Sequence, residues 1–422
     1  MNFEFWIYLE FRIFFMYLTA LDIGTSQIRA LAAEIKKNGQ LSLLGVFKTP
    51  SNGVRKGEIV SVSEVARALS KLFNEIKQVN KAVLKNIFVN VNGVNVKLQN
   101  SRGIIAVSRA DNEIYSDDIE RAIKASQAIN LGSNRIILHT ITREFIVDGI
   151  VGISDPLGMT GSRLEVNSLI IDAFKPAVNN LIKAIEAAGG KIGGLIYNPL
   201  ANSRSVLSKT QKELGAVMID IGFGVTSMAT YEEDNLLQAA VFPVGSSNIT
   251  NDLAIGLKCS IRTAEAIKLS WGSAMAKEIS IKEKVSLGEI DETLKSIVSR
   301  RFISEIIEVR LAEIFEFVNN ELKLIGKSGQ LPAGAIIAGA GAKIPNLIDL
   351  AKRELKLPAQ LGFADFSLIE FINAGLEANL EDLEFGAAVG LLLWGADQSS
   401  KDIAWLTSGK SRLLKILKHF LP

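Results

Sequence analysis

The chain has 422 residues with a formal net charge of +2 at pH 7, and 48% of its residues are hydrophobic and 22% charged. This length is more than one hydrophobic core usually spans, so we expect about two to four domains. The small net charge gives no reason to expect nucleic acid as a partner. A single cysteine, Cys259, excludes an internal disulfide bond and a cysteine-based zinc site. The two histidines, His139 and His419, argue against a histidine metal cluster and a histidine-based hydrolase triad.

The first eighteen residues, MNFEFWIYLEFRIFFMYL, are strongly apolar, but Glu4, Glu10 and Arg12 interrupt them. They leave no unbroken span of about 20 apolar residues, which a membrane-crossing helix needs. No basic segment or small-residue cleavage site marks a signal peptide. We interpret residues 1–16 as a non-native or disordered extension, with translation starting at Met16. A segment that lies in a membrane interface is the alternative.

From Tyr17 onward, predicted strands and helices alternate. The stretches YLTALDI, LAAEIKK and LSLLGVFKT have the pattern of strands, and Asn38-Gly39 predicts a turn between the last two. Ser61 and Glu64 have the spacing of a capping box, which predicts the start of a helix. The segment 84–166 contains further predicted strands around one helix, SDDIERAIKASQAI. We therefore expect a small α+β module inserted into a larger fold.

The second half of the chain continues this alternation and closes with an apolar helix, LEFGAAVGLLLWG. A long amphipathic helix carries apolar residues at helical spacing over 301–323. The other elements that we predict are a helix at 175–188, a strand GGLIYN, a helix from Asn202, a strand AVMIDIG, hairpin strands at 225–231 and 236–242, helices near 251–257 and 262–276, and a strand with a glycine turn near 334–341. This alternation indicates an α/β protein whose sheets are covered by helices.

An internal repeat is the strongest functional signal. LDIGTSQIRAL at 21–31 and IDIGFGVTSMAT at 219–230 share a strand, then Asp, Ile and Gly, then a turn and a hydroxyl residue that opens a second strand. Backbone N–H groups of such a turn can bind phosphate, and the aspartate can bind Mg²⁺ directly or through water. Two such turns could hold one triphosphate between two similar lobes. A strand that merely ends in a turn is the alternative for each.

A third glycine turn, IIAGAGAKIPNL at 336–347, follows a predicted strand and precedes a helix. In a two-lobed clamp, its backbone would pack against the base and the α-phosphate, where side chains would clash. A plain connection between a strand and a helix is the alternative.

With these three turns in this order, the chain resembles the actin, Hsp70 and sugar-kinase superfamily. Within that superfamily, it is similar to the FtsA family of bacterial cell-division proteins from about residue 17 to the end. The stretches that carry this similarity are HTITREFIVDGIVGISDPLGMTGSRLEV at 139–166, VGSSNITNDLAIGL at 244–257, TAEAIKLSWGSA at 263–274, RRFISEIIEVRLAEIF at 300–315, and the tail GKSRLLKILKHFLP. The resemblance implies an α/β, two-lobed actin-like ATPase fold of duplicated ribonuclease-H-like domains with an inserted small α+β subdomain.

The same resemblance divides the chain into subdomains. After the extension 1–16, these are lobe 1 at 17–83 and 167–213, the insert at 84–166, lobe 2 at 214–260 and 261–325, a return segment of lobe 2 with the closing helix of lobe 1 at 326–398, a linker at 399–409, and an amphipathic helix at 410–422. The insert would replace a subdomain that actin carries elsewhere.

The resemblance also implies a site for ATP and Mg²⁺. Asp22 and Asp220 would bind the metal ion. Glu265 and Lys268, one helical turn apart, would contact ribose and base, and an exposed surface pair is the alternative for these two. The full set of implied nucleotide-binding residues is Asp22, Gly24, Thr25, Ser26, Asp220, Gly222, Gly224, Thr226, Gly245, Glu265, Lys268, Gly339, Ala340 and Gly341.

The second phosphate loop departs from the pattern D-I-G-G-G-T-x-D that is usual in the superfamily. Phe223, Val225 and Ser227 replace glycine, threonine and aspartate, and Ala338 and Ala340 alter the third turn. At the site that positions the attacking water, active relatives tend to have Glu or Gln. Here that residue is Asn198, which is shorter and not basic. We therefore predict nucleotide binding with slow turnover or none.

The terminal segment 410–422 has the pattern of a short basic amphipathic helix. Its apolar side would carry Leu413, Leu414, Leu417, Phe420 and Leu421, and its basic side Lys410, Arg412, Lys415 and Lys418. Such a helix suits the headgroup region of an anionic membrane. Together with this pattern, the resemblance implies a peripheral protein on the cytoplasmic face of the cell membrane at the division site. A helix docked on the protein's own core is the alternative.

The resemblance implies protein partners as well. These are the C-terminal tail of the tubulin-like protein FtsZ, bound by the subdomain at roughly 265–320, and further division proteins, bound by the insert. Arg300 and Arg301 would suit an acidic peptide, and a solvated helix start is the alternative for them. Anchoring by one short helix is weak, so we also expect head-to-tail filaments. The alternative functions are a related pilus-assembly ATP-binding protein and, from another class, a sugar kinase.

Overall fold

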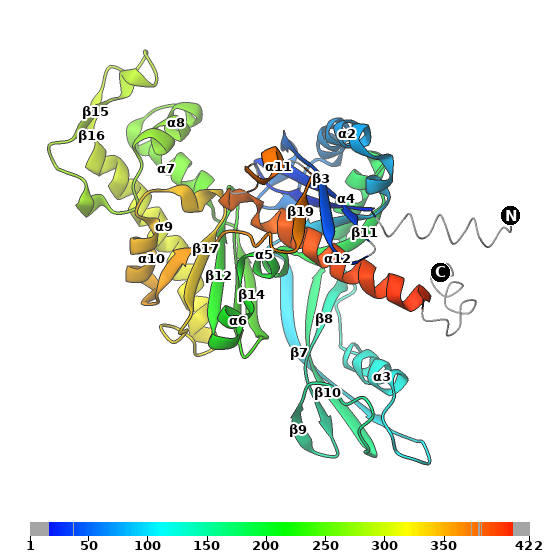
Figure 1. Ribbon diagram of the computed structural model, residues 1–422. Coiled ribbons are helices and arrows are strands. Elements are labelled where there is room, and N and C mark those ends of the chain that lie inside the picture. The colour runs from blue at the N-terminus through cyan, green and yellow to red at the C-terminus, as the bar shows by residue number, and fades with distance from the viewer. Residues whose placement is uncertain (1–16, 37, 373, 379, 381, 408–422) are drawn as a thin grey trace.

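The computed structural model describes residues 17–407, except residues 37, 373, 379 and 381. In this part of the chain two lobes lie side by side, and a narrow insert extends from the base of lobe 1 (Figure 1). None of the helices within the described ranges is long and apolar enough to cross a membrane. The predicted extension 1–16 and the predicted terminal helix 410–422 lie outside the described residues.

Lobe 1 is built on a six-stranded mixed sheet with helices on both faces. α2 (Val62–Val79) and α4 (Lys175–Ala187) cover one face, and α12 (Gly386–Thr407) covers the other. Ser61 caps α2, because its Oγ accepts a hydrogen bond from Glu64 N–H at 3.4 Å. In spatial order the strands are β11 (Ile192–Tyr197), β6 (Ile87–Val91), β1 (Tyr17–Ile23), β2 (Gln27–Ile35), β3 (Leu41–Pro50) and β19 (Ile369–Phe371).

Lobe 2 is built on a five-stranded sheet whose outer face is covered by helices. These helices are α7 (Ser246–Leu257), α9 (Arg300–Leu324) and α10 (Leu347–Leu355), and α8 (Ile261–Trp271) packs on them. Between the two sheets lies α5 (Asn198–Val206), whose Leu200 and Ala201 belong to a core shared by both lobes. In spatial order the strands are β14 (Asn235–Phe242), β13 (Thr226–Glu232), β12 (Ala216–Ile221), β17 (Gly334–Ala338) and β18 (Ala359–Leu361).

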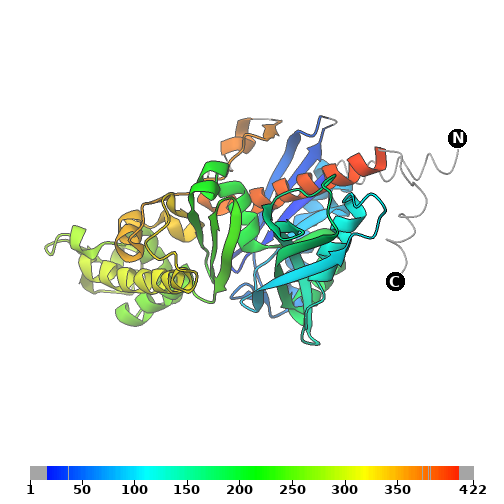
Figure 2. The same cartoon turned by 90° about the horizontal axis from the view of Figure 1, so that it is seen from below.

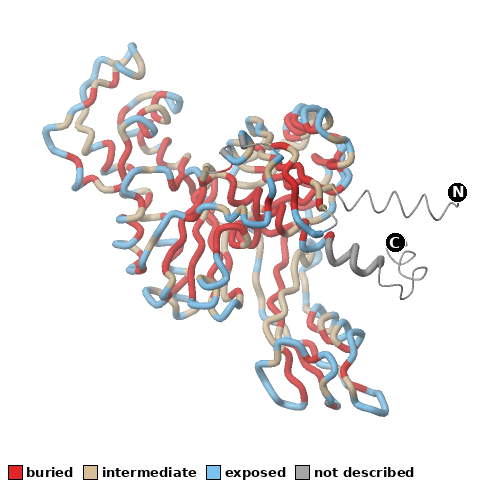
Figure 3. The backbone as a smooth tube through the Cα atoms, viewed as in Figure 1, coloured by how far each residue is buried: buried red, intermediate tan, exposed pale blue. Residues whose placement is uncertain are grey.

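The two lobes repeat one structural unit. In lobe 1, β1 pairs with β2 so that Asp22 lies opposite Arg29, and in lobe 2, β12 pairs with β13 so that Asp220 lies opposite Ser227. Each aspartate strand has a parallel neighbour on its other side, β6 in lobe 1 and β17 in lobe 2. The duplicated α/β fold with covered sheets, predicted from the repeated Asp-Ile-Gly turns, is thereby confirmed. Buried positions follow the central strands of both lobes (Figure 3).

The insert is a separate four-stranded sheet with one helix on its face, α3 (Ser116–Ser126). Val107, Ile114 and Phe145 belong to its own small core. The sequence assigns 84–166 to the insert, but β6 pairs in parallel with β1 and β11 and is therefore a strand of lobe 1. The strands of the insert are, in spatial order, β7 (Val96–Ala106), β10 (Arg163–Phe174), β8 (Arg135–Val147) and β9 (Ile150–Ile153).

Several helix boundaries differ from the sequence prediction. α7 begins at Ser246 rather than near 251, and α8 ends at Trp271 rather than near 276. α5 begins at Asn198 rather than Asn202, because Pro199 is well tolerated in a first helical turn. α12 starts at the junction of the lobes, runs away from lobe 2, and continues to Thr407 (Figures 1 and 2). The described part of the predicted linker 399–409 is therefore helical, and its sequence has neither Gly nor Pro before residue 409 to end a helix.

The remaining elements are short and connect the main ones. They are β4 (Val54–Arg55), β5 (Glu58–Ile59), α6 (Lys209–Leu214), β15 (Lys284–Ser286), β16 (Ile297–Ser299), α11 (Ala374–Ala378), and the 3₁₀ turns η1 (Lys81–Lys85), η2 (Ala276–Glu278), η3 (Leu287–Glu289), η4 (Ala340–Lys343) and η5 (Leu383–Phe385). Of these, η4 and η5 contribute residues to the cavity between the lobes.

Candidate nucleotide-binding site

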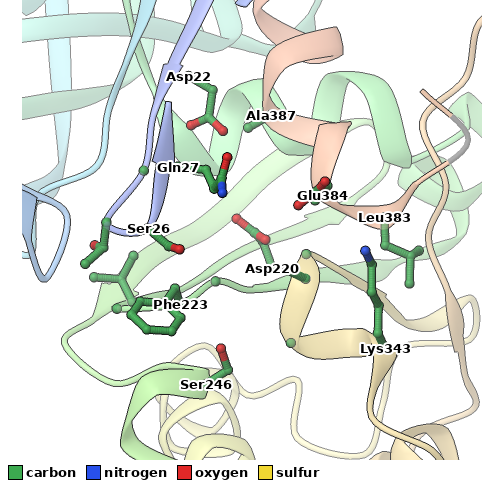
Figure 4. A pocket seen from close by; sticks show the side chains of 18 of the residues that line it. Asp22, Ser26, Gln27, Asp220, Phe223, Ser246, Lys343, Leu383, Glu384 and Ala387 are labelled. Atoms are coloured by element: carbon green, nitrogen blue, oxygen red, sulfur yellow. The ribbon is translucent and has the colours of Figure 1, made fainter. Parts of the chain in front are cut away.

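A cavity of about 600 Å³ lies where the two lobes meet, within the size range of small-molecule sites. The three glycine turns that the sequence singles out all reach it, and Figure 4 shows Asp22, Ser26, Asp220 and Phe223 around it. The sequence-predicted residues that line it are Asp22, Gly24, Thr25, Ser26, Asn198, Asp220, Gly222, Gly224, Glu265, Lys268, Gly339, Ala340 and Gly341. Segments more than 300 residues apart in the sequence therefore build one site.

The first two glycine turns have the same backbone geometry. Gly24 N–H donates to the Gln27 carbonyl at 3.0 Å, and Gly222 N–H donates to the Val225 carbonyl at 2.9 Å. A Cβ atom added at Gly24 or at Gly222 would lie 2.9 Å from that same carbonyl oxygen. Such a contact is too close for any side chain, so glycine is needed for the turn itself. Both turns line the cavity, and an anion there would have to use N–H groups of the turns other than those of Gly24 and Gly222, which are paired within the turns.

The third turn, at the end of β17, packs its backbone directly on the second one. Gly339 has φ +88°, and a Cβ atom there would clash with Asp220 Oδ1 and with the Ile221 carbonyl. A Cβ atom at Gly341 would lie 2.5 Å from Ile221 Cγ2. Only glycine meets both the left-handed conformation and this close approach. The predicted third loop is thus positioned beside the Asp220 carboxylate, on the lobe 2 side of the cavity.

A chain of buried side-chain amides joins the two aspartates. Asn90 Nδ2 donates to Asp22 Oδ1 at 2.6 Å and to Asn198 Oδ1 at 3.1 Å. Asn198 Nδ2 lies 3.4 Å from Asp220 Oδ2, and Asn202 Nδ2 donates to the same oxygen at 2.9 Å. Amides from β6 and α5 therefore hold the carboxylates of opposite lobes in one network.

The environment of both aspartates disfavours their ionised forms. Loss of solvation raises the pKa of Asp22, and the charge of Arg29 opposes this rise. Loss of solvation and then the charge of Asp22 raise the pKa of Asp220 to about 6. A divalent cation near both carboxylates would stabilise the ionised pair.

The described residues contain no group of three His, Cys, Asp or Glu side chains arranged to hold a metal ion. Two carboxylates alone do not complete the six oxygen ligands that Mg²⁺ prefers. A metal ion bound by Asp22 and Asp220 would therefore take its other oxygens from water or from a bound phosphate. This donor set fits a magnesium ion that arrives with a nucleotide better than a permanent structural metal.

Glu265 and Lys268 form a partly buried pair rather than an exposed one. Lys268 is only 5% exposed, and its Nζ donates to Glu265 Oε2 at 2.7 Å and to Thr250 Oγ1 at 3.0 Å. Thr250 Oγ1 also donates to Glu265 Oε2 at 2.5 Å. This triad joins α7 and α8 at the edge of the cavity, so the surface-pair alternative for these residues is not supported.

Phe223 sits at the tip of the second loop, and its side chain lines the cavity (Figure 4). The backbone around it is fixed, because the Gly222 and Phe223 carbonyls accept hydrogen bonds from Ser246 N–H and Ser247 N–H at 2.9 and 2.8 Å. The loop thereby caps the start of α7. Phe223 can vary without altering this cap, since the hydrogen bonds use only its carbonyl.

Two predicted site residues do not line the cavity. Thr226 is fully buried and its hydroxyl donates to the Val244 carbonyl at 2.9 Å, so it supports the hairpin. Gly245 precedes α7, and a Cβ atom there would lie 2.6 Å from the Phe223 carbonyl oxygen. Both therefore support the second loop from behind instead of facing the cavity.

The sequence did not single out three residues that structure brings into this region, namely Arg29, Asn90 and Glu384. Arg29 and Glu384 line the cavity, and Arg29 Nη2 donates to Glu384 Oε2 at 2.6 Å. The first repeat carries a signal for Arg29, because it lies opposite Asp22 in the hairpin. Asn90 and Glu384 are distant from both repeats in the sequence and have no such signal.

Comparison with known proteins identifies the family. The family profile described as "Cell division protein FtsA" matches residues 217–390. A cell division protein FtsA of Pseudomonas aeruginosa is 30% identical to this chain over 93% of the chain and 93% of the relative. That of Bacillus subtilis is 35% identical over 80% of the chain and 76% of the relative. The chain belongs to the FtsA family of cell division proteins.

The insert also matches a profile of the FtsA family. A profile described as "SHS2 domain inserted in FTSA" matches residues 93–172. This range agrees closely with the sheet of β7 to β10 and leaves β6 to lobe 1.

Solved structures confirm the two-lobed actin-like fold of this FtsA relative. The PilM–PilN type IV pilus biogenesis complex aligns with a TM-score of 0.64 at 17% identity, over 90% of this chain and 98% of that chain. MreB5 of Spiroplasma citri bound to ADP aligns with a TM-score of 0.53 at 13% identity, over 92% of this chain and 98% of that chain. At such identities the likeness concerns the fold alone.

The predicted partner residues lie away from the cavity, at the start of α9. Arg300 Nη1 pairs with Glu283 at 2.7 Å and its Nε donates to the Trp271 carbonyl at 3.1 Å. Arg301 Nε lies 3.3 Å from Glu305. Both guanidinium groups thus have acidic neighbours within the chain, with which an acidic peptide would compete.

Proposed function

We propose that this FtsA-family protein binds ATP with Mg²⁺ in the cavity between the lobes. The observation that carries this proposal is the pair of glycine turns with the same hydrogen-bond pattern, each beside an aspartate of its own lobe, with Asp22 buried and Asp220 partly buried. Their N–H groups suit the phosphates, and Asp22 and Asp220 suit the metal ion. The metal would neutralise phosphate charge and the two carboxylates together.

The other lining residues fit the remainder of the nucleotide. The backbone of Gly339, Ala340 and Gly341 suits the α-phosphate and the base, because the methyl group of Ala340 is the only side chain of this turn. Glu265 and Lys268 offer a carboxylate and an ammonium group at the cavity edge, which suit ribose hydroxyls and base nitrogens.

We further propose that the protein turns ATP over slowly or not at all. Asn198 would occupy the position of the residue that orients the attacking water. Its side-chain amide already forms hydrogen bonds with Asn90 and Asp220. An amide is not a base, so it cannot accept the proton of an attacking water. The protein would therefore act by holding a nucleotide rather than by consuming it.

The cellular role that we propose is that of an adaptor in the division ring. The segment 410–422 would bind an anionic membrane, and the surface around α8 and α9, with Arg300 and Arg301, would bind the C-terminal tail of FtsZ. Head-to-tail filaments of the protein would multiply both weak contacts, and the insert would bind further division proteins. Membership of the FtsA family supports this role.

Calorimetric titration with ATP, with and without Mg²⁺, tests the nucleotide proposal. We expect binding that strengthens with Mg²⁺ and that Asp220→Asn weakens. Asp349→Asn, which removes an exposed carboxylate paired with Lys352 outside the cavity, is the matched control. Absence of ATP binding by the folded wild type would refute the proposal. Retention of the protein by an immobilised acidic FtsZ tail peptide, reduced in Arg300→Ala, tests the adaptor role separately.

A further inference from the structure

A carboxylate that the proposed ATP site does not need lies inside the cavity. Glu384 belongs to η5, and its side chain lies around the same part of the cavity as Asp22 and Asp220 (Figure 4). Its side chain is 17% exposed. Phosphates carry negative charge, so a third nearby carboxylate opposes their binding unless a cation compensates it.

The cation that compensates Glu384 is Arg29. Arg29 Nη2 lies 2.6 Å from Glu384 Oε2, whereas its Nη1 lies 3.4 Å from Asp22. The Arg29 side chain is 11% exposed, and its Nε is buried without a hydrogen-bond partner in the described part of the chain. The shorter of its two ion pairs is therefore the one with Glu384.

Arg29 is also the group in this part of the cavity best suited to a phosphate. A guanidinium group presents a planar set of donors that match two phosphate oxygens at once. It lies opposite Asp22 in the first repeat and lines the cavity with both glycine turns. A phosphate that approached Arg29 would meet the donor already engaged by Glu384, so the two anions compete for one guanidinium.

The segment that carries Glu384 is tied to both lobes. Asp382 pairs with Lys343 at 2.5 Å, and the Leu383 carbonyl accepts a hydrogen bond from Gly339 N–H at 3.0 Å, both on the lobe 2 side. Glu384 connects the segment to lobe 1 through its ion pair with Arg29, and η5 leads directly into α12. Displacement of Glu384 would therefore break the ion pair between η5 and lobe 1, while the contacts of Asp382 and Leu383 with lobe 2 remain.

We propose that Glu384 is an internal competitor for phosphate, which occupies Arg29 in the nucleotide-free protein and is displaced when a nucleotide binds. Glu384 thus lowers the affinity for ligands in proportion to their phosphate contacts and is a specificity-determining residue of the site. This inference rests on the proposed ATP site. No residue of the chain has to react for it, because the exchange replaces one ion pair by another.

The test compares the affinities of the full-length wild type and Glu384→Gln for ATP, ADP and adenosine by calorimetry. Glutamine keeps the size of the side chain but removes its charge. We expect Glu384→Gln to bind ATP about tenfold more tightly, because a charge-assisted hydrogen bond no longer has to be broken. Adenosine, which has no phosphate, should bind both proteins equally.

Two further variants make the result specific. Glu370 lies on β19, outside the cavity, and forms an exposed ion pair with Lys36. Glu370→Gln removes this carboxylate and should bind ATP like the wild type. Arg29→Gln removes the guanidinium group for which Glu384 and a phosphate compete, so it should bind ATP more weakly than the wild type and adenosine equally well. Thermal unfolding of each variant checks that it is folded. If Arg29→Gln does not fold, Glu384→Asp, which keeps the charge, should retain an affinity close to that of the wild type.

Unchanged or weaker ATP binding by folded Glu384→Gln overturns the inference and leaves the ATP site standing. An equal gain for ATP and adenosine also overturns it, because the effect would then not depend on phosphate. If neither the wild type nor Glu384→Gln binds any of the three ligands, the proposed function fails and this inference fails with it.

Discussion

Thr25 and Gly224 come from opposite lobes and are in contact across the cavity. A Cβ atom at position 224 would lie 2.6 Å from Thr25 Oγ1 and 2.9 Å from Thr25 Cβ. The Thr25 hydroxyl also accepts a hydrogen bond from Gly57 N–H at 3.1 Å, which fixes its position. The first two glycine turns thus touch each other directly, and the absence of a side chain at residue 224 allows this close approach of the lobes.

This contact predicts that Gly224→Ala separates the loops and weakens ATP binding. The added methyl group cannot avoid Thr25, because the close atoms belong to the short, branched threonine side chain. Overpacking of this kind costs about 1–3 kcal/mol. We expect a lower melting temperature and an ATP affinity reduced by about tenfold or more, measured by calorimetry.

The matched control for Gly224→Ala is the double variant Gly224→Ala with Thr25→Gly. Removing the threonine side chain makes room for the methyl group, so the double variant should regain part of the melting temperature that Gly224→Ala loses. The contact would be contradicted if the double variant were less stable than the sum of the two single changes in unfolding free energy predicts.

Asn198 lies at the centre of the amide network, and its replacement tests whether it has a role beyond that network. Asn198→Ala leaves Asn90 and Asp220 each without one buried hydrogen-bond partner. We expect a loss of about 1–3 kcal/mol in the free energy of unfolding. The proposed slow hydrolysis of ATP should fall by less than about tenfold, whereas removal of a true general base typically costs 10²–10⁴ in rate.

Asn202→Ala is the comparison variant, because Asn202 donates to the same Asp220 oxygen. If Asn198 only supports Asp220, both variants should change ATP affinity and hydrolysis alike. A hundredfold loss of hydrolysis confined to Asn198→Ala would show instead that Asn198 positions the attacking water.

Much of the fold could be predicted because it follows from local patterns. The repeated Asp-Ile-Gly turns predict the duplicated hairpins, and the apolar spacing of 301–323 predicts α9, which the structure places at Arg300–Leu324. The boundary of the insert was less predictable. β6 is a strand in either assignment, and only its parallel pairing with β1 and β11 shows that it belongs to lobe 1.

The candidate site was predictable where backbone dictates residue type and unpredictable where side chains meet across the fold. Gly24, Gly222 and Gly339 could be found because close approach leaves no room for a side chain. The pair of Arg29 and Glu384 joins residues 355 positions apart, and no local pattern relates them. The departure at Phe223 was visible in the sequence, but the backbone cap of α7, which uses only the Phe223 carbonyl and so leaves the side chain free to vary, was not.

His139 predicts a pH dependence of stability that is independent of the cavity. Its Nε2 accepts a hydrogen bond from Tyr197 N–H at 3.0 Å, and its ring packs against Trp394 with centroids 5.8 Å apart. Loss of solvation lowers the pKa of His139 from 6.5 to about 4. The neutral imidazole is the form that accepts this hydrogen bond, so protonation removes the link between the insert and the start of α5.

The sign of the effect follows from the lowered pKa in the folded state. Between pH 6.5 and about 4 the unfolded chain binds a proton at His139 that the folded chain does not, so stability falls as pH falls. The loss amounts to about 3 kcal/mol over this window. His139→Gln should show a correspondingly shallower dependence in denaturant unfolding, and His419→Gln is the matched control. An imidazole NMR titration of His139 with a midpoint near 6.5 would contradict the prediction.

The terminal segment 410–422 predicts membrane binding that depends on both charge and apolar surface. Each basic residue near an anionic surface contributes about 1 kcal/mol, and the leucine side chains add burial in the headgroup region. We expect the full-length protein to sediment with anionic vesicles and a protein that ends at residue 409 to remain in solution. Neutral vesicles or high salt should weaken binding, because both reduce the electrostatic attraction.

Two matched variants separate these contributions. Leu413→Ser with Leu417→Ser keeps all four basic residues of GKSRLLKILKHFLP, and Lys415→Gln with Lys418→Gln keeps all its apolar ones. If the segment lies in the interface, the leucine variant should lose binding to both kinds of vesicle, whereas the lysine variant should lose most of its preference for anionic vesicles. Equal sedimentation of the full-length and truncated proteins would place membrane contact elsewhere in the chain.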